Sequence, residues 1–144
     1  MKINLRSSPI FSLTMLVSLG ALAAGCGSPL EGTYIAEHRL IEGMTESSEP
    51  GYTLEDFQSK RPRDTPSLTL NRNGRFEWNT GDVINEGAWR VEGETLFLRT
   101  DINDGRTIGG ALRMDREWWI DENGEIVRTD AFQLYHMVEV YVPQ

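Results

Sequence analysis

Cysteine is almost absent from this sequence, with Cys26 as the single one among 144 residues. One thiol cannot form an internal disulfide, and it cannot supply the cysteine cluster of a structural metal site. We therefore predict a domain that folds without disulfides or thiolate-bound metal. The position of Cys26 near the amino terminus calls for a separate explanation.

Histidine is nearly as scarce, with His38 and His136 alone. Neither lies in a recognisable catalytic or metal-binding motif, and the chain contains no Gly-x-Ser-x-Gly nucleophile turn. The loop from Asp101 to Asp104 is rich in calcium-type ligands but lacks EF-hand spacing, so a weak calcium site there is only an alternative. We predict no catalytic residue, no metal and no cofactor, and therefore no enzyme.

Basic residues are outnumbered, with 14 Lys and Arg against 22 Asp and Glu and a net charge of -8. Removal of residues 1–25 would take away Lys2 and Arg6 and change the net charge from -8 to -10. An acidic domain of this kind repels the phosphates of nucleic acids. We therefore predict that the protein binds no nucleic acid.

The amino-terminal apolar run, IFSLTMLVSLGAL at residues 10–22, is too short to cross a bilayer as a helix. It follows a start that carries Lys2 and Arg6 without an acid, and it precedes the small residues 23–25. These are the three parts of a secretory signal. The pattern predicts a signal peptide over residues 1–25.

A cysteine directly follows this segment, so the stretch LAAGC ends at Cys26. The stretch resembles the lipobox of bacterial lipoproteins, although Ala23 stands where that family usually has leucine. The resemblance implies acylation of Cys26 with chains such as palmitate, which anchor durably when more than one is present. It also implies a lipid-anchored protein of the cell envelope, and Gly27 in the next position implies the outer membrane if the source is Gram-negative. An ordinary cleavage site with a free thiol is the alternative.

Residues 26–31 form a short tether, and residues 32–144 show the alternation of β-strands. In SLTLNRNGRFEWNT, leucines alternate up to Asn73-Gly74, a dipeptide suited to a hairpin turn, and aromatic residues resume the alternation. GAWRVEG and ETLFLRT flank a second turn at Gly93, and DENG separates ALRMDREWWI from EIVRT. We predict an all-β antiparallel meander that forms a small barrel or half-barrel of seven to eight strands.

One long polar segment, residues 42–66, interrupts the strands. Within it, Thr53 and Asp56 have the spacing of a capping box, and Pro62 would end the helix that they begin. A connection of this length in a small domain is usually a lid, a binding loop or disordered. We predict one short helix inside this loop.

The order GTY, LTLNRNGRFEW and GAWRVEGETLFL resembles small lipocalin-like bacterial lipoproteins, over residues 32–142. The resemblance implies a lipocalin-like β-barrel for residues 32–144 that binds a small ligand. The chain departs from the family at Tyr34, where the family has tryptophan, and it has no arginine after Arg128. These departures leave open whether the barrel closes around a ligand cavity.

Strand alternation places candidate site residues on inward faces in the segments 111–120 and 131–142. If the even-numbered residues of both segments face the core, Arg116, Trp118 and His136 do so, and two of these are polar. A buried charge needs a partner or water. One interpretation is that these three residues line a ligand pocket; the other, which we favour for Arg116 and His136, is that they lie near a barrel rim or pair with carboxylates.

The same alternation places Trp119, Tyr135 and Tyr141 on the outer face. Large exposed apolar patches usually mark a partner or membrane surface. One interpretation is a partner surface formed by these three aromatic residues. The other, which we favour, is that the long segment 42–66 packs over them, with Leu54 and Phe57 of its short helix as the contacts.

The leading hypothesis is therefore a membrane-anchored envelope lipoprotein that acts as a non-enzymatic binding module for a small ligand or an envelope protein. Its partners would be the membrane, through the amino-terminal lipid, and that ligand or protein. The alternative is a structural or assembly-accessory lipoprotein that acts through an exposed aromatic face or a sheet edge.

Overall fold

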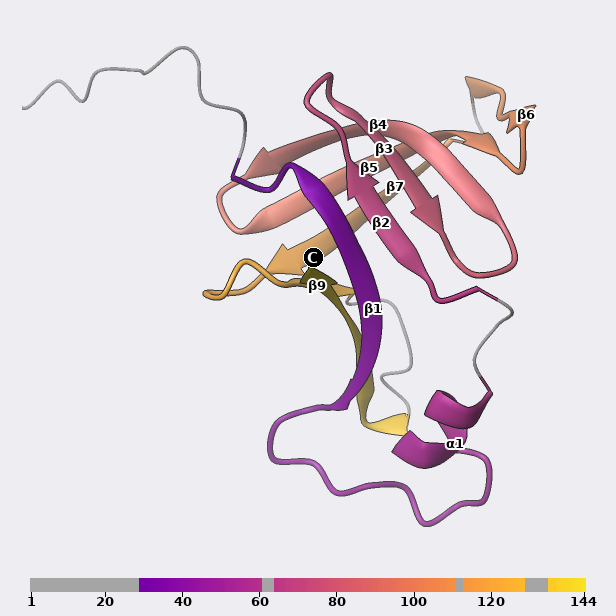
Figure 1. Cartoon of the computed structure of the whole chain (residues 1–144), viewed down its shortest axis with the longest axis vertical. Coiled ribbons are helices and arrows are strands. Elements are labelled where there is room, and N and C mark those ends of the chain that lie inside the picture. Colours follow the sequence, from indigo (N-terminus) through magenta and orange to yellow (C-terminus); the bar gives the residue numbers. More distant parts are fainter. Residues whose placement is uncertain (1–28, 61–63, 111–112, 129–134) are drawn as a thin grey trace, which may run out of the picture.

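The computed structural model describes residues 29–60, 64–110, 113–128 and 135–144. The predicted signal peptide, residues 1–25, and Cys26 lie outside these ranges. Within them the regular secondary structure is almost entirely β-strand, with one short helix (Figure 1). No helix of the described part is long and apolar enough to cross a membrane. The elements in chain order are β1 (Gly32–Leu40), α1 (Leu54–Ser59), β2 (Ser67–Leu70), β3 (Arg75–Asn79), β4 (Ile84–Glu92), β5 (Thr95–Asn103), β6 (Arg106–Thr107), β7 (Met114–Ile120), β8 (Ile126–Arg128) and β9 (Met137–Pro143).

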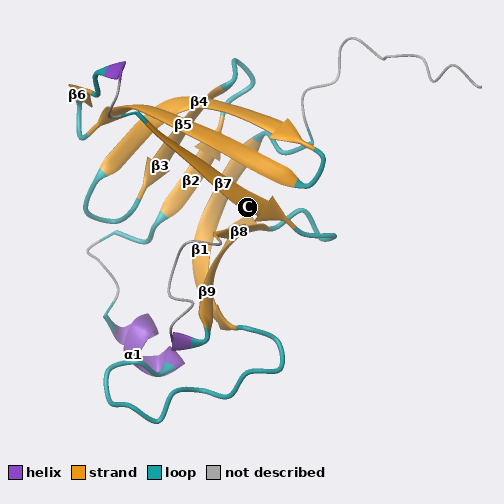
Figure 2. Ribbon diagram, turned by 180° about the vertical axis from the view of Figure 1, so that it is seen from behind, coloured by secondary structure: helices purple, strands orange, loops and turns teal. Residues whose placement is uncertain are grey.

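Eight strands form a closed antiparallel barrel. Strands β1, β2, β3, β4 and β5 pair in that order. β5 then pairs with β7, β7 with β8, and β8 with β9. The barrel closes because β9 pairs with β1 over seven registered residue pairs, from Tyr34 with Pro143 to Leu40 with Met137 (Figure 2). The two-residue β6 is added to β5 outside this circuit. The predicted all-β meander is confirmed, in its closed form with eight strands.

The two ends of the barrel differ in the length of their connections. One end, which we call the short-turn rim, consists of the turns at residues 71–74, 93–94 and 121–125, together with the start of β1 and the end of β9. Glycines in these turns have positive φ angles, 75° at Gly74 and 61° at Gly93, which other residues rarely adopt. The opposite end, the long-loop end, carries α1 and the other connections (Figure 1). The predicted hairpins at Asn73-Gly74 and Gly93 are confirmed.

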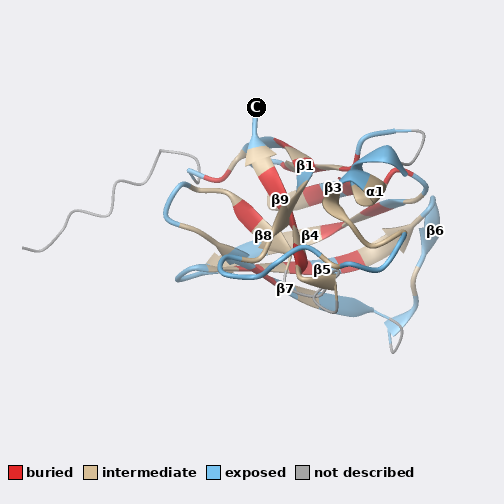
Figure 3. Cartoon of the chain, turned by 90° about the horizontal axis from the view of Figure 1, so that it is seen from below, coloured by how far each residue is buried: buried red, intermediate tan, exposed pale blue. Residues whose placement is uncertain are grey.

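The barrel is filled by side chains from its inner face, and its centre is aromatic. The ring of Trp118 meets that of Trp78 edge-on, with centroids 5.1 Å apart, and stacks on that of Tyr141 at 5.3 Å. Aromatic pairs in these geometries add to the stabilisation from area burial. Leucines and isoleucine complete the packing around them. Buried positions recur along the strands of the barrel (Figure 3). The fully buried large side chains are Trp118, Tyr141, Phe76, Leu68, Leu70, Leu96, Leu98, Ile126 and Met137.

A glycine allows the tight approach between β4 and β5. The register of these strands shifts between Glu86 and Gly87, which is the mark of a β-bulge. A Cβ atom on Gly87 would overlap the carbonyl oxygen of Arg99 and lie 2.8 Å from the ring of Phe76. The strands can therefore meet at this point because residue 87 has no side chain.

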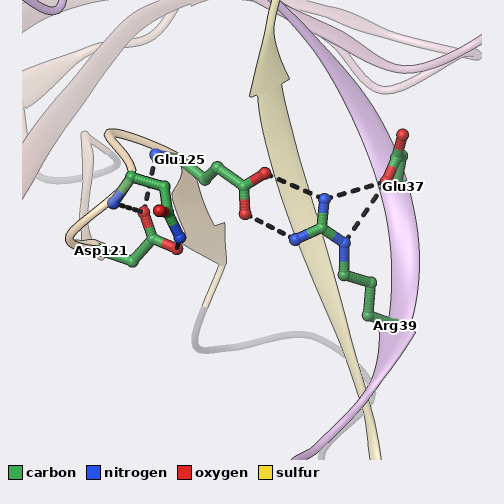
Figure 4. Close-up of polar contacts among 5 residues, drawn as sticks. Glu37, Arg39, Asp121 and Glu125 are labelled. Carbon is green, nitrogen blue, oxygen red and sulfur yellow. Dashed lines mark hydrogen bonds and ion pairs between the residues drawn. The ribbon is translucent and has the colours of Figure 1, made fainter.

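An ion pair on the outer surface spans the closing strand. Arg39 of β1 reaches across β9 to Glu125 of the short-turn rim, with 3.0 Å between its Nη2 and Oε1 (Figure 4). Glu37 accepts a second bond from the same guanidinium at 3.0 Å. Val140, on the outer face of β9, lies between β1 and β8. It is buried although it points away from the barrel core.

The predicted orientation of the last strand is wrong. Met137, Glu139 and Tyr141 of β9 point into the barrel, and Tyr141 is completely buried. In the register with β1, Tyr141 lies opposite Ala36 and Glu139 opposite His38, which both belong to the inner face. The odd-numbered residues of β9 are therefore the inward ones.

The long segment forms the predicted short helix. Thr53 Oγ1 accepts a bond from the Asp56 amide at 3.1 Å, and Asp56 Oδ2 accepts one from the Thr53 amide at 3.2 Å, which confirms the capping box. Pro62, the predicted terminator, lies outside the described residues. The ring of Phe57 lies 5.7 Å from that of His38, so the helix rests against the barrel at the end of β1.

Candidate functional site

A pocket of about 360 Å³ opens at the long-loop end. Its walls come from segments far apart in the sequence, which the closed barrel brings to one place: the ends of β1, β8 and β9, the helix α1, and the turn between β3 and β4. The lining residues are His38, Phe57, Lys60, Pro66, Thr80, Asp82, Arg128 and Glu139.

The floor of this pocket holds a buried carboxylate, Glu139, which is 5% exposed. Its Oε1 accepts hydrogen bonds from the Tyr141 hydroxyl at 2.9 Å and from Arg128 Nη1 at 3.3 Å, and its Oε2 lies 3.5 Å from His38 Nε2. Burial raises the pKa of the Glu139 carboxyl, but the hydrogen bond with His38 and the charge of Arg128 outweigh it and leave the pKa below its usual value. The pocket floor is therefore charged at neutral pH.

A hydrogen-bonded chain continues from Glu139 into the core. The Tyr141 hydroxyl, which donates to Glu139, accepts a bond of 2.6 Å from Trp78 Nε1. Burial, and then the negative charge of Glu139, raise the pKa of Tyr141 far above its ordinary value. The phenol therefore stays protonated and holds the carboxylate in a single orientation.

Two guanidinium groups lie over the ring of Trp78. The Cζ atoms of Arg116 and Arg128 are each 5.0 Å from the ring centroid, within the range of cation–π attraction. Nε and Nη1 of Arg116 are buried inside the barrel. Trp78 therefore joins Arg116 and Trp118 to the network around Glu139.

Comparison of the chain with protein-family models, with curated proteins and with solved structures returned no match. The geometry of the barrel and the residues in it therefore carry the functional argument.

The structure brings together two of the three predicted pocket residues. Arg116 and Trp118 point inward as predicted, and both contact Trp78. His136 precedes β9 with a left-handed φ of 59°, and its Nδ1 lies 3.1 Å from the carbonyl oxygen of Thr45. None of the three predicted residues is among those that line the pocket at the long-loop end, and His38 is the histidine that lines it.

The predicted aromatic partner surface does not form as a unit. Trp119 is 50% exposed, as predicted, but Tyr141 lies in the core, which corrects its assignment to the outer face. Tyr135 stacks on Tyr52 at 4.1 Å and lies 5.9 Å from Phe57, so the long segment packs against it. Trp119 is the one member of the trio that is half-exposed.

Sequence reasoning missed Trp78, Arg128 and Glu139 as site residues. One available signal was Glu139 itself, an acid placed within the otherwise apolar run MVEVYV. Its inward position depends on the pairing of β9 with β1 and β8, which places Arg128 and His38 beside it. No local pattern shows that pairing.

In the loop considered as a calcium site, residues 101–104, Asp101 forms an ion pair with Arg75. Each carboxylate oxygen of Asp101 accepts a bond of 2.9 Å from Arg75, and this pair lowers the pKa of Asp101. Across the ranges that the structure describes, no three His, Cys, Asp or Glu side chains gather as a metal site would require.

A second hollow, of about 450 Å³, opens at the short-turn rim. The Tyr34 hydroxyl, beside this hollow, donates a 2.8 Å bond to the carbonyl oxygen of Leu30 and so fastens the residues that precede β1 to the barrel. Tyr34 is a buried inner residue of the first strand. The lining residues are Pro29, Leu30, Tyr34, Val91, Gly93, Ile120, Asp121, Glu122, Asn123, Gly124 and Pro143.

Proposed function

We propose that this protein is a lipid-anchored envelope lipoprotein whose barrel binds a small organic molecule at the long-loop end, without catalysing a reaction. One observation carries the binding role: a pocket at the end of a closed barrel has a buried, charged and fully hydrogen-bonded group, Glu139, in its floor. Ligand sites typically combine such convergent polar groups with apolar walls.

The size and position of the pocket support a ligand of small dimensions. The volume of about 360 Å³ falls at the lower end of the range of ligand pockets, roughly 300 to 1,000 Å³. Eight-stranded barrels have interiors that side chains fill or that hold one small ligand. Here the aromatic core around Trp118 fills the centre, so the ligand would sit at the end of the barrel.

The lining indicates an amphipathic ligand. Phe57 and Pro66 offer apolar contacts, while Lys60 and Asp82 place opposite charges at the walls. A molecule with an apolar body and a polar or charged group would match both kinds of wall.

Dye binding tests the pocket. Full-length protein in phosphatidylcholine nanodiscs would be titrated with 1-anilinonaphthalene-8-sulfonate, and energy transfer from tryptophan to the dye would be measured. We expect saturable transfer that Phe57→Ser and Lys60→Glu weaken at least about tenfold, because both remove contacts to an aromatic anion. The matched control is Val91→Ser at the opposite end. Equal binding by wild type and both pocket variants would contradict the proposal.

Acylation of Cys26 is tested separately. Cells given an alkyne analogue of palmitate should label the wild-type protein, and Cys26→Ser should abolish the label because the acyl chains attach to that residue. The variant should also leave the membrane fraction or accumulate as an unprocessed precursor. A Cys26→Ser protein that stays membrane-bound and fully processed would argue against lipidation.

One observation favours a second candidate function, a structural or assembly role through an exposed aromatic surface. Trp119 is half-exposed on the outer face of β7, beside Val127 of β8. Under this alternative, Trp119→Ser would abolish co-purification of an envelope protein while the free energy of unfolding stays unchanged. Unchanged co-purification would contradict it.

A further inference from the structure

We propose that the short-turn rim is the surface of the barrel that faces the lipid bilayer, so that the pocket opens toward the aqueous compartment. This inference rests on the proposed anchor at Cys26. It also names the source of the ligand, which would be a molecule dissolved in water rather than one drawn from the bilayer.

The first argument is the length of chain between the anchor and the barrel. Pro29 follows Cys26 by three residues, and an extended chain spans at most ~3.6 Å per residue, or about 11 Å in all. Pro29 and Leu30 line the hollow of the short-turn rim. A lipid on Cys26 would therefore hold this rim within about 11 Å of the membrane surface.

The second argument is the distance from the rim to the pocket. β1 runs from the rim toward the long-loop end (Figure 1). It begins with Gly32 and runs nine residues to Leu40, with His38 of the pocket near its far end. At ~3.3 Å per residue, the strand is about 26 Å long. The link to Cys26 is much shorter than the strand, so the barrel cannot invert and press the pocket against the lipid.

The third argument is the chemistry of the two candidate contact surfaces. The hollow at the rim has an apolar wall that includes Leu30, Val91, Ile120 and Pro143, and the acidic residues Asp121 and Glu122 also line it. The outer wall of the barrel carries exposed charges on four strands, and these stay hydrated best in open water. Those on β3, β4, β5 and β7 are Glu77, Arg90, Arg99, Asp115 and Glu117. An upright barrel keeps this wall away from the bilayer.

The position of α1 agrees with this orientation. The helix lies at the end of the barrel away from the rim (Figure 2). The helix and the turn at residues 80–83 both contribute to the lining of the pocket. A small molecule would reach Lys60 and Asp82 through water, without crossing the lipid surface.

Depth-dependent quenching tests the orientation. Because Cys26 is the single cysteine and would be acylated, an introduced cysteine is the one free thiol. The variants Glu122→Cys at the rim, Glu117→Cys on the outer wall and Gln58→Cys on α1 are all at exposed positions. Each would be labelled with a fluorescent maleimide and bound to phosphatidylcholine vesicles that contain phosphatidylcholine spin-labelled on its headgroup.

We expect the label at residue 122 to lose most of its fluorescence, the label at residue 117 to lose less, and the label at residue 58 to lose none. Equal losses at residues 58 and 122 would overturn the orientation, and so would the greatest loss at residue 117, which indicates a barrel lying on its side. Flotation of the same samples shows whether the protein is anchored. Protein that does not float would overturn the anchor and this inference together, whereas the dye titration tests the pocket independently.

Discussion

The hydroxyl of Tyr141 donates a 2.9 Å hydrogen bond to the carboxylate of Glu139, two residues earlier on the same inner face of β9. This short link joins the aromatic core to the pocket floor, because the same hydroxyl accepts a bond from Trp78. Arg128 and His38 complete the partners of the carboxylate. Several consequences of this arrangement can be measured.

Tyr141→Phe should lower the free energy of unfolding by roughly 1–3 kcal/mol. The substitution leaves Trp78 Nε1 buried without its acceptor and removes a donor from Glu139. Urea titration followed by tryptophan fluorescence measures the change. Tyr135→Phe, which removes a hydrogen bond with Tyr52 at the protein surface, is the control and should cost less. A loss for Tyr141→Phe no larger than that of the control would show that the buried chain contributes nothing.

Glu139→Gln should flatten the dependence of stability on acid pH. The folded-state pKa of Glu139 lies below its unfolded value of about 4.5, so its contribution is present above that pH and is lost as the pH falls through the folded pKa. The variant lacks this contribution and should be less stable at neutral pH by on the order of 2 kcal/mol. Urea unfolding measured at several values between about pH 3 and pH 7 tests both effects, because carboxyl groups titrate within this range. Glu94→Gln, in an exposed turn, should run parallel to the wild type.

The ion pair between Arg39 and Glu125 should show a coupling free energy of about 1 kcal/mol in a double-mutant cycle with alanine. The pair is bidentate, and Glu125 is largely buried, although Arg39 is partly exposed and screened by water. The comparison pair is Arg90 and Glu92, where both side chains are exposed, and its coupling should be near zero. Equal coupling energies for the two pairs would contradict the expectation.

Gly87→Ala should destabilise the barrel by about 3 kcal/mol or prevent it from folding. The new methyl group would overlap the backbone of Arg99, which cannot move without breaking the β4–β5 pairing. Gly109→Ala is the matched control, since its Cβ would meet open space. Thermal unfolding of both variants gives the result, and an unchanged midpoint for Gly87→Ala would disprove the role assigned to the close approach.

Local chemistry explains which elements could be predicted. The Asn73-Gly74 turn and the Thr53–Asp56 capping box each lie within a few residues, and both are present as expected. Trp118 and Trp119 were also placed correctly, because polar side chains on one face of β7 leave little choice of the other.

The predicted orientation of the last strand, β9, was wrong for a physical reason. Both of its faces are rich in apolar residues, with Val138 and Val142 on one and Met137 and Tyr141 on the other, so alternation did not distinguish them. Side-chain volume and charge pairing decide which face of β9 points inward. The large ring of Tyr141 fills the core, and partners from other strands compensate for the burial of Glu139.

The sequence by itself determined an all-β meander with short hairpins and one capped helix, because turn and cap preferences act over a few residues. Tertiary structure alone decided that β9 closes the barrel on β1, and so that His38, Arg128 and Glu139 meet in one pocket floor. Contacts between residues far apart in the chain depend on strand register, and register is settled by the packing of the whole core.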